Sequence, residues 1–310
     1  MKFGIHNPSW LFGSDPYEMF EALKKKVQWV EANGFNWFSL MDHLIQIPFV
    51  GAADEPFMEG WSTLSALAAV TKEIRLATLV TSVAYRNPAH LAKIAAGVDI
   101  ISGGRLTFGI GAGWHVTEYR QYGWEFPEKP AVRIAQMEEA IQVVLKMWSE
   151  PRATFHGKYF HINEAILEPK PLQKPHPPVM IGGSGEQLTL RAVARWADAC
   201  NLFGDPATVK HKLEVLRGHC DKEGRDFSTI ERTNLTSFLI AKDELALKAK
   251  KERMNLPDPF RGNALTVSQT VDLVGAYQEA GTQMLIFSSC QNDVETLELF
   301  AEEVIPKFAE

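Results

Sequence analysis

The chain has 310 residues, of which 45% are hydrophobic and 23% are charged, and its formal net charge is -6 at pH 7. This length allows one α/β barrel or two ordinary domains, each with a large apolar core. The negative charge and the lack of a basic run argue against a nucleic acid or an anionic membrane as partner, which favours a small molecule. The N-terminus shows no apolar signal core, and no window approaches the roughly 18 uncharged residues of a membrane span. Three cysteines without C-x-x-C spacing predict reduced, buried thiols in a cytoplasmic protein.

Strand patterns alternate with helix patterns along most of the chain. Apolar runs predict eight strands, at 2–6, 37–41, 74–80, 105–109, from 179, and at 199–203, 233–240 and 284–287. Amphipathic periodicity and capping residues predict helices at 16–33, 61–70, from 88, and at 132–148, 187–196, 206–223, 244–253, 268–280 and 294–303. This alternation predicts an α/β fold, a (β/α)₈ TIM barrel with inserted loops; an open doubly wound sheet is the alternative.

The regular alternation breaks between the fourth and fifth predicted strands. The stretch 114–130 is aromatic and polar, 154–162 is typical of a hairpin, and five prolines between 169 and 178 predict a stiff connector. We therefore expect a single barrel domain over 1–310 with an insertion around 114–178.

Two glycine-rich strand ends are candidate ligand contacts. Gly109, Gly111 and Gly113 alternate where a strand ends, which suits either a tight turn or the close approach of a ligand. No helix opens on these glycines, so the dinucleotide-binding fingerprint does not apply. The segment 182–185 is followed by a helix, and such a loop is a good anion cradle because free N–H groups converge there.

In a barrel, polar residues at the strand ends meet at one mouth. These residues are His6, Asn7, Asp42, His43, Thr81, Ser82, Gly111 to Trp114, Gly182 to Ser184, Phe203, Gly204 and Ser288. The set is poor in carboxylates, so a two-metal hydrolase or a retaining glycosidase lacks its required groups and we expect no metal site. Asp42 and His43 are the strongest candidates for proton transfer, since an imidazole can give or take a proton near neutral pH. The alternative is that His43 only hydrogen-bonds its own loop.

Several other side chains are weaker candidates. Trp10 and Trp114 would stack on a planar ligand if they lie at the mouth. Glu118 would line a substrate pocket, although most of its neighbours from 115 to 120 are expected at the surface. Arg86 is interpreted as a solvated charge at a helix start rather than as a phosphate contact.

Three segments, 80–88, 101–114 and 168–183, together resemble the luciferase-like monooxygenase superfamily, and within it the oxidoreductases that use the deazaflavin coenzyme F420. The similarity runs from Met1 to about Arg225. It implies a dimeric TIM barrel that holds a flavin or deazaflavin ring in its mouth, with His43 as proton donor or acceptor and Asp42 orienting it. It also implies a non-prolyl cis peptide at Ser82-Val83. The implied cofactor contacts are His6, Thr81, Ser82, Val83, Ala112, Gly113, Gly182, Gly183, Ser184 and Gly185.

The resemblance implies a hydride transfer between coenzyme F420 and a small organic substrate. Two alternatives stay open: an FMN-dependent two-component monooxygenase or flavin reductase, the former with a flavin reductase as partner, and a barrel that binds flavin without catalysis. Several sugar-phosphate-oxidising relatives carry an acid at the position of Trp114, so that reaction is not expected here.

Overall fold

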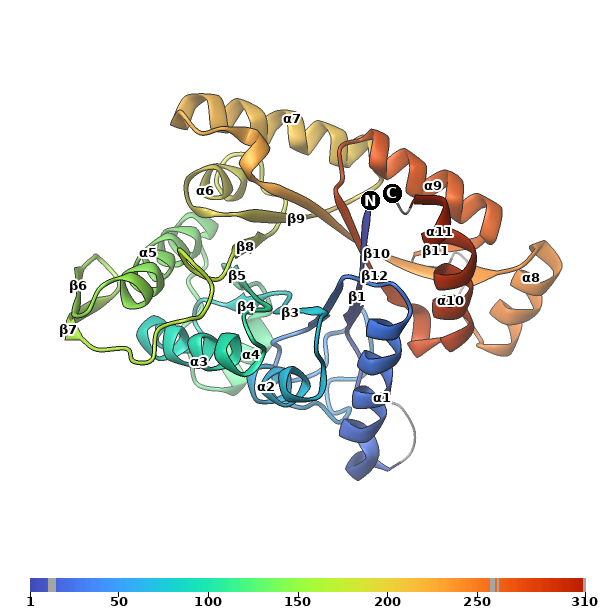
Figure 1. Cartoon of the computed structure of the whole chain (residues 1–310), viewed down its shortest axis with the longest axis horizontal. Helices are drawn as coiled ribbons and strands as arrows, with labels where there is room; N and C mark the ends of the chain where they lie inside the picture. The colour runs from blue at the N-terminus through green and yellow to red at the C-terminus, as the bar shows by residue number, and fades with distance from the viewer. Residues whose placement is uncertain (11–14, 257–259, 261, 309–310) are drawn as a thin grey trace.

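The computed structural model describes residues 1–10, 15–256, 260 and 262–308. Eight parallel strands close into a barrel in which β12 pairs with β1 (Figure 1). Around the barrel they are β1 (Lys2–Asn7), β2 (Trp37–Leu40), β3 (Arg75–Thr78), β5 (Leu106–Gly111), β8 (Val179–Gly182), β9 (Ala199–Phe203), β10 (Glu231–Ala241) and β12 (Met284–Ser289). The predicted TIM barrel is confirmed, and the open sheet is wrong.

Helices cover the outside of the barrel. They are α1 (Met19–Ala32), α2 (Gly60–Val70), α3 (Pro88–Ile101), α4 (Val116–Gln121), α5 (Pro130–Ser149), α6 (Thr189–Trp196), α7 (Pro206–Glu223), α8 (Glu244–Arg253), α9 (Val267–Glu279), α10 (Val294–Leu299) and α11 (Ile305–Phe308). A π-helical turn, Phe300–Val304, joins the last two, and 3₁₀ turns lie at Pro16–Glu18, Phe227–Thr229 and Cys290–Asn292. Every predicted helix is present, within a few residues of its predicted bounds.

Side-chain caps fix where the helices begin. Asn87 accepts hydrogen bonds from the amides of Ala89 and His90, and Pro88 takes the first helical position of α3. At the start of α9, Thr266 and Gln269 form a reciprocal capping box. These caps follow strand ends, so they also fix the loops that surround the mouth of the barrel.

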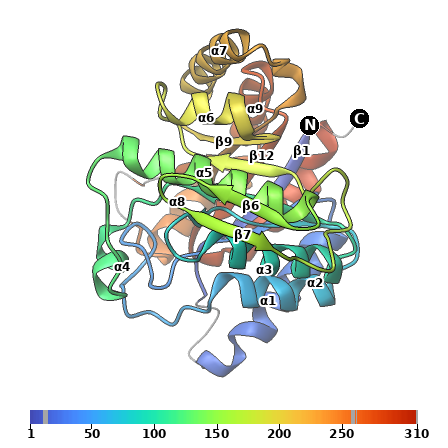
Figure 2. The ribbon, with the colours of Figure 1, turned by 90° about the vertical axis from the view of Figure 1, so that its left-hand side faces the viewer.

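Several elements, among them α4, β4 and β11, were not predicted because each is too short to show a period. α4 lies in the stretch expected to be irregular, while β4 (Thr81–Ser82) and β11 (Asn263–Thr266) add to β5 and β10 at the edge of the barrel. The predicted hairpin is confirmed as β6 (Ala153–His156) and β7 (His161–Ala165), an antiparallel pair beside α5 (Figure 2).

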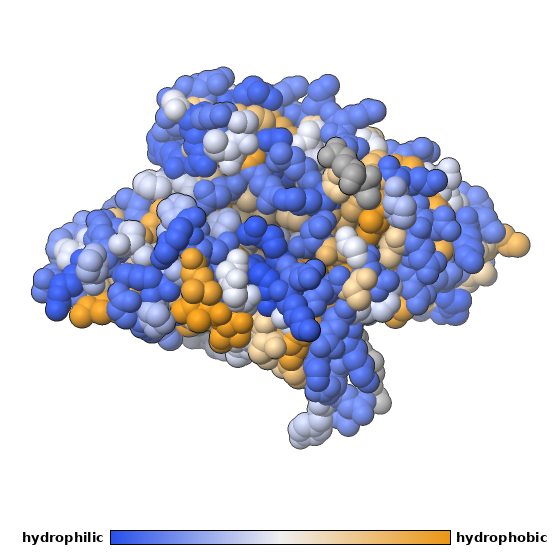
Figure 3. All heavy atoms as spheres, viewed as in Figure 1, coloured by the Kyte–Doolittle hydropathy of each residue, from blue (hydrophilic) through white to orange (hydrophobic). Residues whose placement is uncertain are grey.

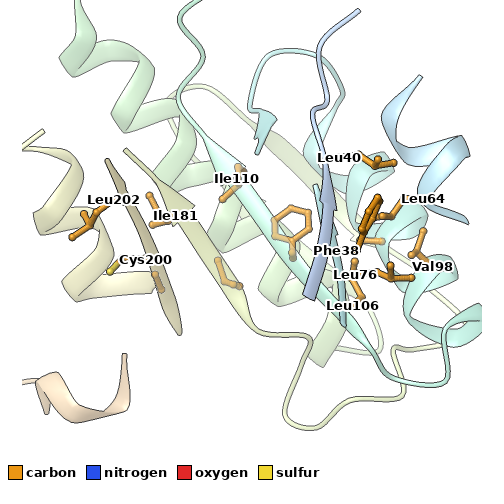
Figure 4. Packing of buried hydrophobic residues seen from close by; sticks show 14 of the residues in the cluster. Phe38, Leu40, Leu64, Leu76, Val98, Leu106, Ile110, Ile181, Cys200 and Leu202 are labelled. Carbon is orange, nitrogen blue, oxygen red and sulfur yellow. The ribbon is translucent and has the colours of Figure 1, made fainter. Parts of the chain in front are cut away.

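The strands alternate between two apolar layers. Trp37, Ala77, Met180, Ala199, Met284 and Ile286 form a buried cluster inside the barrel. Their neighbours in the chain, among them Phe38, Leu76, Ile181 and Cys200, point outward and pack under the helices (Figure 4). Since successive strand residues face opposite sides, this alternation decides which residues reach the mouth.

In the described ranges no helix is long and apolar enough to cross a bilayer. All three cysteines are free: Cys200 and Cys220 are buried, and Cys290 is partly exposed.

Candidate active site

A cavity of about 320 Å³ opens at the carboxyl ends of the strands. The loop after β3, the loop after β5, and the ends of β8 and β9 supply most of its wall. Its lining residues are His43, Leu79, Val80, Thr81, Ser82, Tyr85, Gly111, Ala112, Gly113, Trp114, Ile134, Gly182, Gly183, Thr189, Asn201 and Phe203. Carboxyl strand ends are where TIM barrels place their ligand sites.

The floor of the cavity is the segment between β3 and β4. The peptide bond Leu79-Val80 is cis, so the non-prolyl cis bond expected at Ser82-Val83 lies three residues earlier. The cis bond therefore lies directly after β3, which ends at Thr78. Val83 itself is buried in the outer apolar layer and does not line the cavity.

The glycines around the floor are required by packing of the protein itself. A methyl group on Gly111 would lie 2.8 Å from Val80 Cγ2, and one on Gly182 would lie 3.0 Å from Val80 Cγ1. At Gly109 the added carbon would meet the Thr78 carbonyl oxygen at 2.0 Å. The glycines of β5 and β8 therefore make room for the loop that carries Val80. That loop presents a backbone surface to the cavity.

One side of the cavity has features that fit a flat cofactor with an anionic tail. Gly183 has a φ of 129° and lies beside Thr189, the first residue of α6. The Asn201 side chain is fully buried in the wall: its Oδ1 accepts from Thr233 Oγ1 at 2.9 Å, whereas its Nδ2 has no partner among the described residues. An unpaired buried donor beside a ligand-sized cavity suits a carbonyl oxygen of a bound ring.

His43 lies in the opposite wall, and the side of its ring that faces away from the cavity is bonded to Glu118. Its Nδ1 is 2.7 Å from Glu118 Oε2, and its side chain is 13% exposed. Because Nδ1 donates to a carboxylate, Nε2 is the ring nitrogen left for a ligand. The predicted approach of His43 to the mouth is therefore seen in the structure, and its bond runs to a residue outside its own loop.

Glu118 is a fully buried carboxylate on α4. Besides His43, it accepts hydrogen bonds from the Leu44 amide at 2.5 Å, the Ile45 amide at 3.2 Å and the Tyr85 hydroxyl. Burial raises its pKa, but the bonds from His43, Tyr85 and Leu44 outweigh this effect and leave the pKa below its usual value. Glu118 is thus an anion at neutral pH, and it does not line the cavity as expected from sequence.

Asp42 faces away from His43, which corrects the expected role of this pair. Like Leu40 two residues earlier, it points outward, where it accepts from Thr81 Oγ1 and from both terminal nitrogens of Arg86, at 2.6 and 2.9 Å. Arg86 also bonds Glu59, and its side chain is 12% exposed. Arg86 is therefore a buried ion-pair partner, neither a solvated charge nor a phosphate contact.

Other predicted site residues lie apart from the cavity. His6 is buried and bonds Ser39 Oγ through Nδ1 at 3.0 Å; burial, and then Lys26 and His43, lower its pKa to about 3. Trp10 is fully buried against Phe57, so it is not available for stacking. Ser184 and Gly185 follow Gly183 without lining the cavity, whereas Thr81, Ser82, Ala112, Gly113, Gly182, Gly183 and Trp114 do line it.

Sequence reasoning missed Tyr85 and Asn201, which line the cavity. It named Glu118 as a substrate-pocket residue, whereas Glu118 anchors the histidine. The predicted surface positions His115 and Tyr119 are also buried. The sequence held one signal for the burial of His115, Glu118 and Tyr119. The segment after Trp114 is long enough for a short helix, follows a strand end directly, and carries acidic and aromatic side chains.

The fold and the cavity define a (β/α)₈-barrel protein with a ligand site at the carboxyl ends of its strands. A family model described as luciferase-like monooxygenase matches residues 1–286, and the chain belongs to this family of oxidoreductases.

Relatives in this family use different cofactors, as their names state. The F420-dependent glucose-6-phosphate dehydrogenase of Microbacterium testaceum is 27% identical over 341 aligned positions, covering 99% of this chain and 97% of the relative. The FMNH(2)-dependent dimethylsulfone monooxygenase of Pseudomonas putida is 28% identical over 240 positions, covering 75% and 64%. The structure of the F420-dependent tetrahydromethanopterin reductase of Methanopyrus kandleri matches with a TM-score of 0.80 at 20% identity, covering 99% of both chains.

Proposed function

We propose that the protein transfers a hydride between coenzyme F420 and a small organic substrate, with His43 as the proton donor or acceptor. The observation that carries this proposal is the His43–Glu118 pair: an imidazole in the cavity wall, fixed through Nδ1 by a buried anionic carboxylate. Such a pair orients one ring nitrogen toward a reacting oxygen and stabilises the imidazolium form during proton transfer. A general acid or base of this type is what an alcohol or ketone substrate needs.

The cavity supports a deazaflavin or flavin as the redox partner. Gly111, Gly182 and Gly183 present backbone without side chains, and the Asn201 amide offers an unpaired donor in the same wall. These groups would hold the ring, and the turn after Gly183 at the start of α6 would receive its phosphate. Bound deazaflavin would supply or accept the hydride, which no side chain of the protein can do.

An FMN-dependent monooxygenase is the second candidate. The neutral Asn201 amide and the side-chain-free glycine backbone would serve either ring system, and a relative named as FMNH(2)-dependent aligns over 75% of this chain. In that case a separate flavin reductase would supply the reduced cofactor. A protein that binds flavin without catalysis is the third candidate, and it would bind the cofactor but show neither oxygen uptake nor turnover of an alcohol or ketone.

The test is a fluorescence titration of the cofactor-free protein with coenzyme F420 and, in parallel, with FMN, followed by an oxygen-uptake assay. Tight F420 binding without oxygen uptake supports hydride transfer. Preferential FMN binding with oxygen consumption would replace the proposal by the monooxygenase. The variant His43→Ala should keep cofactor affinity within about threefold and abolish turnover. Unchanged turnover in this variant would remove His43 from the mechanism.

We also propose that two copies of the chain associate through α2 and α3. Each helix carries an exposed apolar residue, Ala69 on α2 and Ile101 on α3, and Ile101 is 51% exposed. Apolar surface gathers over this part of the molecule (Figure 3). Ile101→Glu should convert a dimer to a monomer in sedimentation velocity, and a monomeric parent protein would refute the proposal.

A further inference from the structure

An aromatic wall stands next to His43 at the entrance of the cavity. Trp114, at the end of the loop after β5, is 49% exposed and stacks on Phe49 with ring centroids 5.9 Å apart and an interplanar angle of 30°. The edge of the His43 ring meets Trp114 at 5.5 Å. Large aromatic side chains exposed at a cavity rim have lost the burial that normally stabilises them, so a ligand that covers them gains that burial.

Part of the cavity lining is apolar. Ile134 comes from α5, Leu79 and Val80 come from the floor, and Phe203 at the end of β9 is 48% exposed. These side chains offer no hydrogen bonds. A bound substrate would therefore be held against them by contact area and by ring stacking, with His43 as the polar group in contact with Trp114. The hydroxyl groups of Thr81, Ser82 and Tyr85 also line the cavity.

No lysine, arginine, aspartate or glutamate is found among the described residues that line the cavity. The nearest carboxylates in the site, Asp42 and Glu118, are buried and bonded to Arg86 and His43. A substrate with a phosphate or carboxylate beside Trp114 would lose hydration, and the one cation it would meet, a protonated His43, already has its charge balanced by Glu118, so binding the anion is costly. The wall therefore selects for an uncharged molecule.

We propose that the substrates are uncharged aryl ketones or aldehydes, and the corresponding secondary or primary alcohols, bound with the aryl ring against Trp114. This inference rests on the proposed hydride transfer. In the reduction, a reduced cofactor bound in the cavity would supply the hydride to the carbonyl carbon, the C=O π bond would break, and His43 would give the proton to the oxygen. Stacking of the aryl ring on Trp114 places the carbonyl group next to His43, because the two side chains are in contact.

The inference is tested by binding, so that it does not depend on turnover. Protein saturated with oxidised cofactor is titrated with acetophenone, with cyclohexyl methyl ketone and with phenylglyoxylate, and each Kd is measured by saturation-transfer NMR. Acetophenone should bind about tenfold more tightly than its saturated analogue, as expected for loss of one aromatic pair, and more tightly than the anion. Equal affinities, preference for the anion, or no binding of acetophenone would overturn the inference.

Variants test whether Trp114 causes the preference for acetophenone over its saturated analogue. Trp114→Ala should abolish the tenfold preference, and Trp114→Phe should keep most of it. Tyr122→Ala is the matched control, because Tyr122 is also 49% exposed and stacked, on Trp124 at 5.4 Å, but it lies outside the cavity lining. A Trp114→Ala variant that keeps the preference overturns the inference. If neither F420 nor FMN binds, the proposed function fails, and the same titrations on cofactor-free protein still decide whether Trp114 selects aryl rings.

Discussion

Replacing Glu118 by Gln tests how the histidine is held. The change keeps the shape of the side chain but removes the negative charge and turns one acceptor oxygen into a donor. Oε1 bonds the Leu44 and Ile45 amides, and Oε2 receives His43 Nδ1 and the Tyr85 hydroxyl. If the amide oxygen keeps the two backbone bonds, the new NH₂ group faces the histidine and the tyrosine, both of which are donors in the parent protein.

The expected loss follows from that geometry. A hydrogen bond to a charged group contributes about 1.5–3 kcal/mol, and this bond is fully used when His43 carries a proton in the reaction. Since about 1.4 kcal/mol corresponds to a factor of ten in rate, kcat should fall by about 10- to 100-fold. The cofactor Kd should stay within about threefold, because Glu118 does not line the cavity.

The assay combines steady-state kinetics of F420 reduction or oxidation with cofactor titration and ¹⁵N NMR of the histidine ring. In the parent protein the ring proton of neutral His43 resides on Nδ1; in the variant we expect a mixture of tautomers. Glu31→Gln is the matched control. Glu31 also anchors backbone amides, those of Lys72, Glu73 and Ile74 at 2.8–3.0 Å, but at the opposite end of the barrel. A kcat that falls equally in both variants, or an unchanged tautomer in Glu118→Gln, would refute the positioning role.

Three further predictions concern the scaffold of the site. Gly111→Ala should lower the free energy of unfolding by about 1–3 kcal/mol and weaken cofactor binding, because its methyl group would press on Val80. Gly218→Ala, whose methyl group would meet open space on α7, should raise the free energy of unfolding by about 0.5–1 kcal/mol. Urea denaturation measures both changes. Arg86→Met should destabilise by about 3–5 kcal/mol because it leaves Asp42 buried without its cation, and Asp42→Asn in that background should recover part of the loss. The pKa of His6 is lowered to about 3, so the folded state binds fewer protons than the unfolded state between about pH 6.5 and 3, and stability falls on acidification through this window. His6→Gln should remove up to about 1.4 kcal/mol per pH unit of that fall, and parallel denaturation curves from pH 6.5 to 4.5 for both proteins would contradict it.

The architecture was accessible from sequence because its signal is local. Each barrel strand is a short apolar run, and most helix starts have a proline or a capping side chain near the first turn, as at Asn87-Pro88 and Asp205-Pro206. Neither feature needs a distant partner to be recognised. Only elements of two to six residues, such as β4 and α4, escaped this reasoning, since they are shorter than the period that would identify them.

The site was less accessible because its contacts are long-range. Glu118 is 75 residues from His43 in the chain, and nothing in the local pattern says which buried carboxylate meets which imidazole. The assignment of Asp42 failed for a simpler reason: neighbours on an extended segment point to opposite faces, so Asp42 and His43 cannot both face the mouth. The cis peptide was placed three residues too far along because its position depends on how Val80 packs among glycines of two other strands.

The two buried carboxylates, Asp42 and Glu118, have different roles in the site. Asp42 belongs to the outer layer, where Arg86 ties it to Glu59 at the start of α2, and its bond to Thr81 reaches the cavity wall from behind. Glu118 acts on the other wall, where it fixes the ring of His43. Because the two clusters share no hydrogen bond, changes in the first should act mainly on the shape of the cofactor pocket and changes in the second mainly on proton transfer. Cofactor affinity and turnover are therefore expected to respond to different substitutions, although Asp42 and His43 are adjacent in the chain.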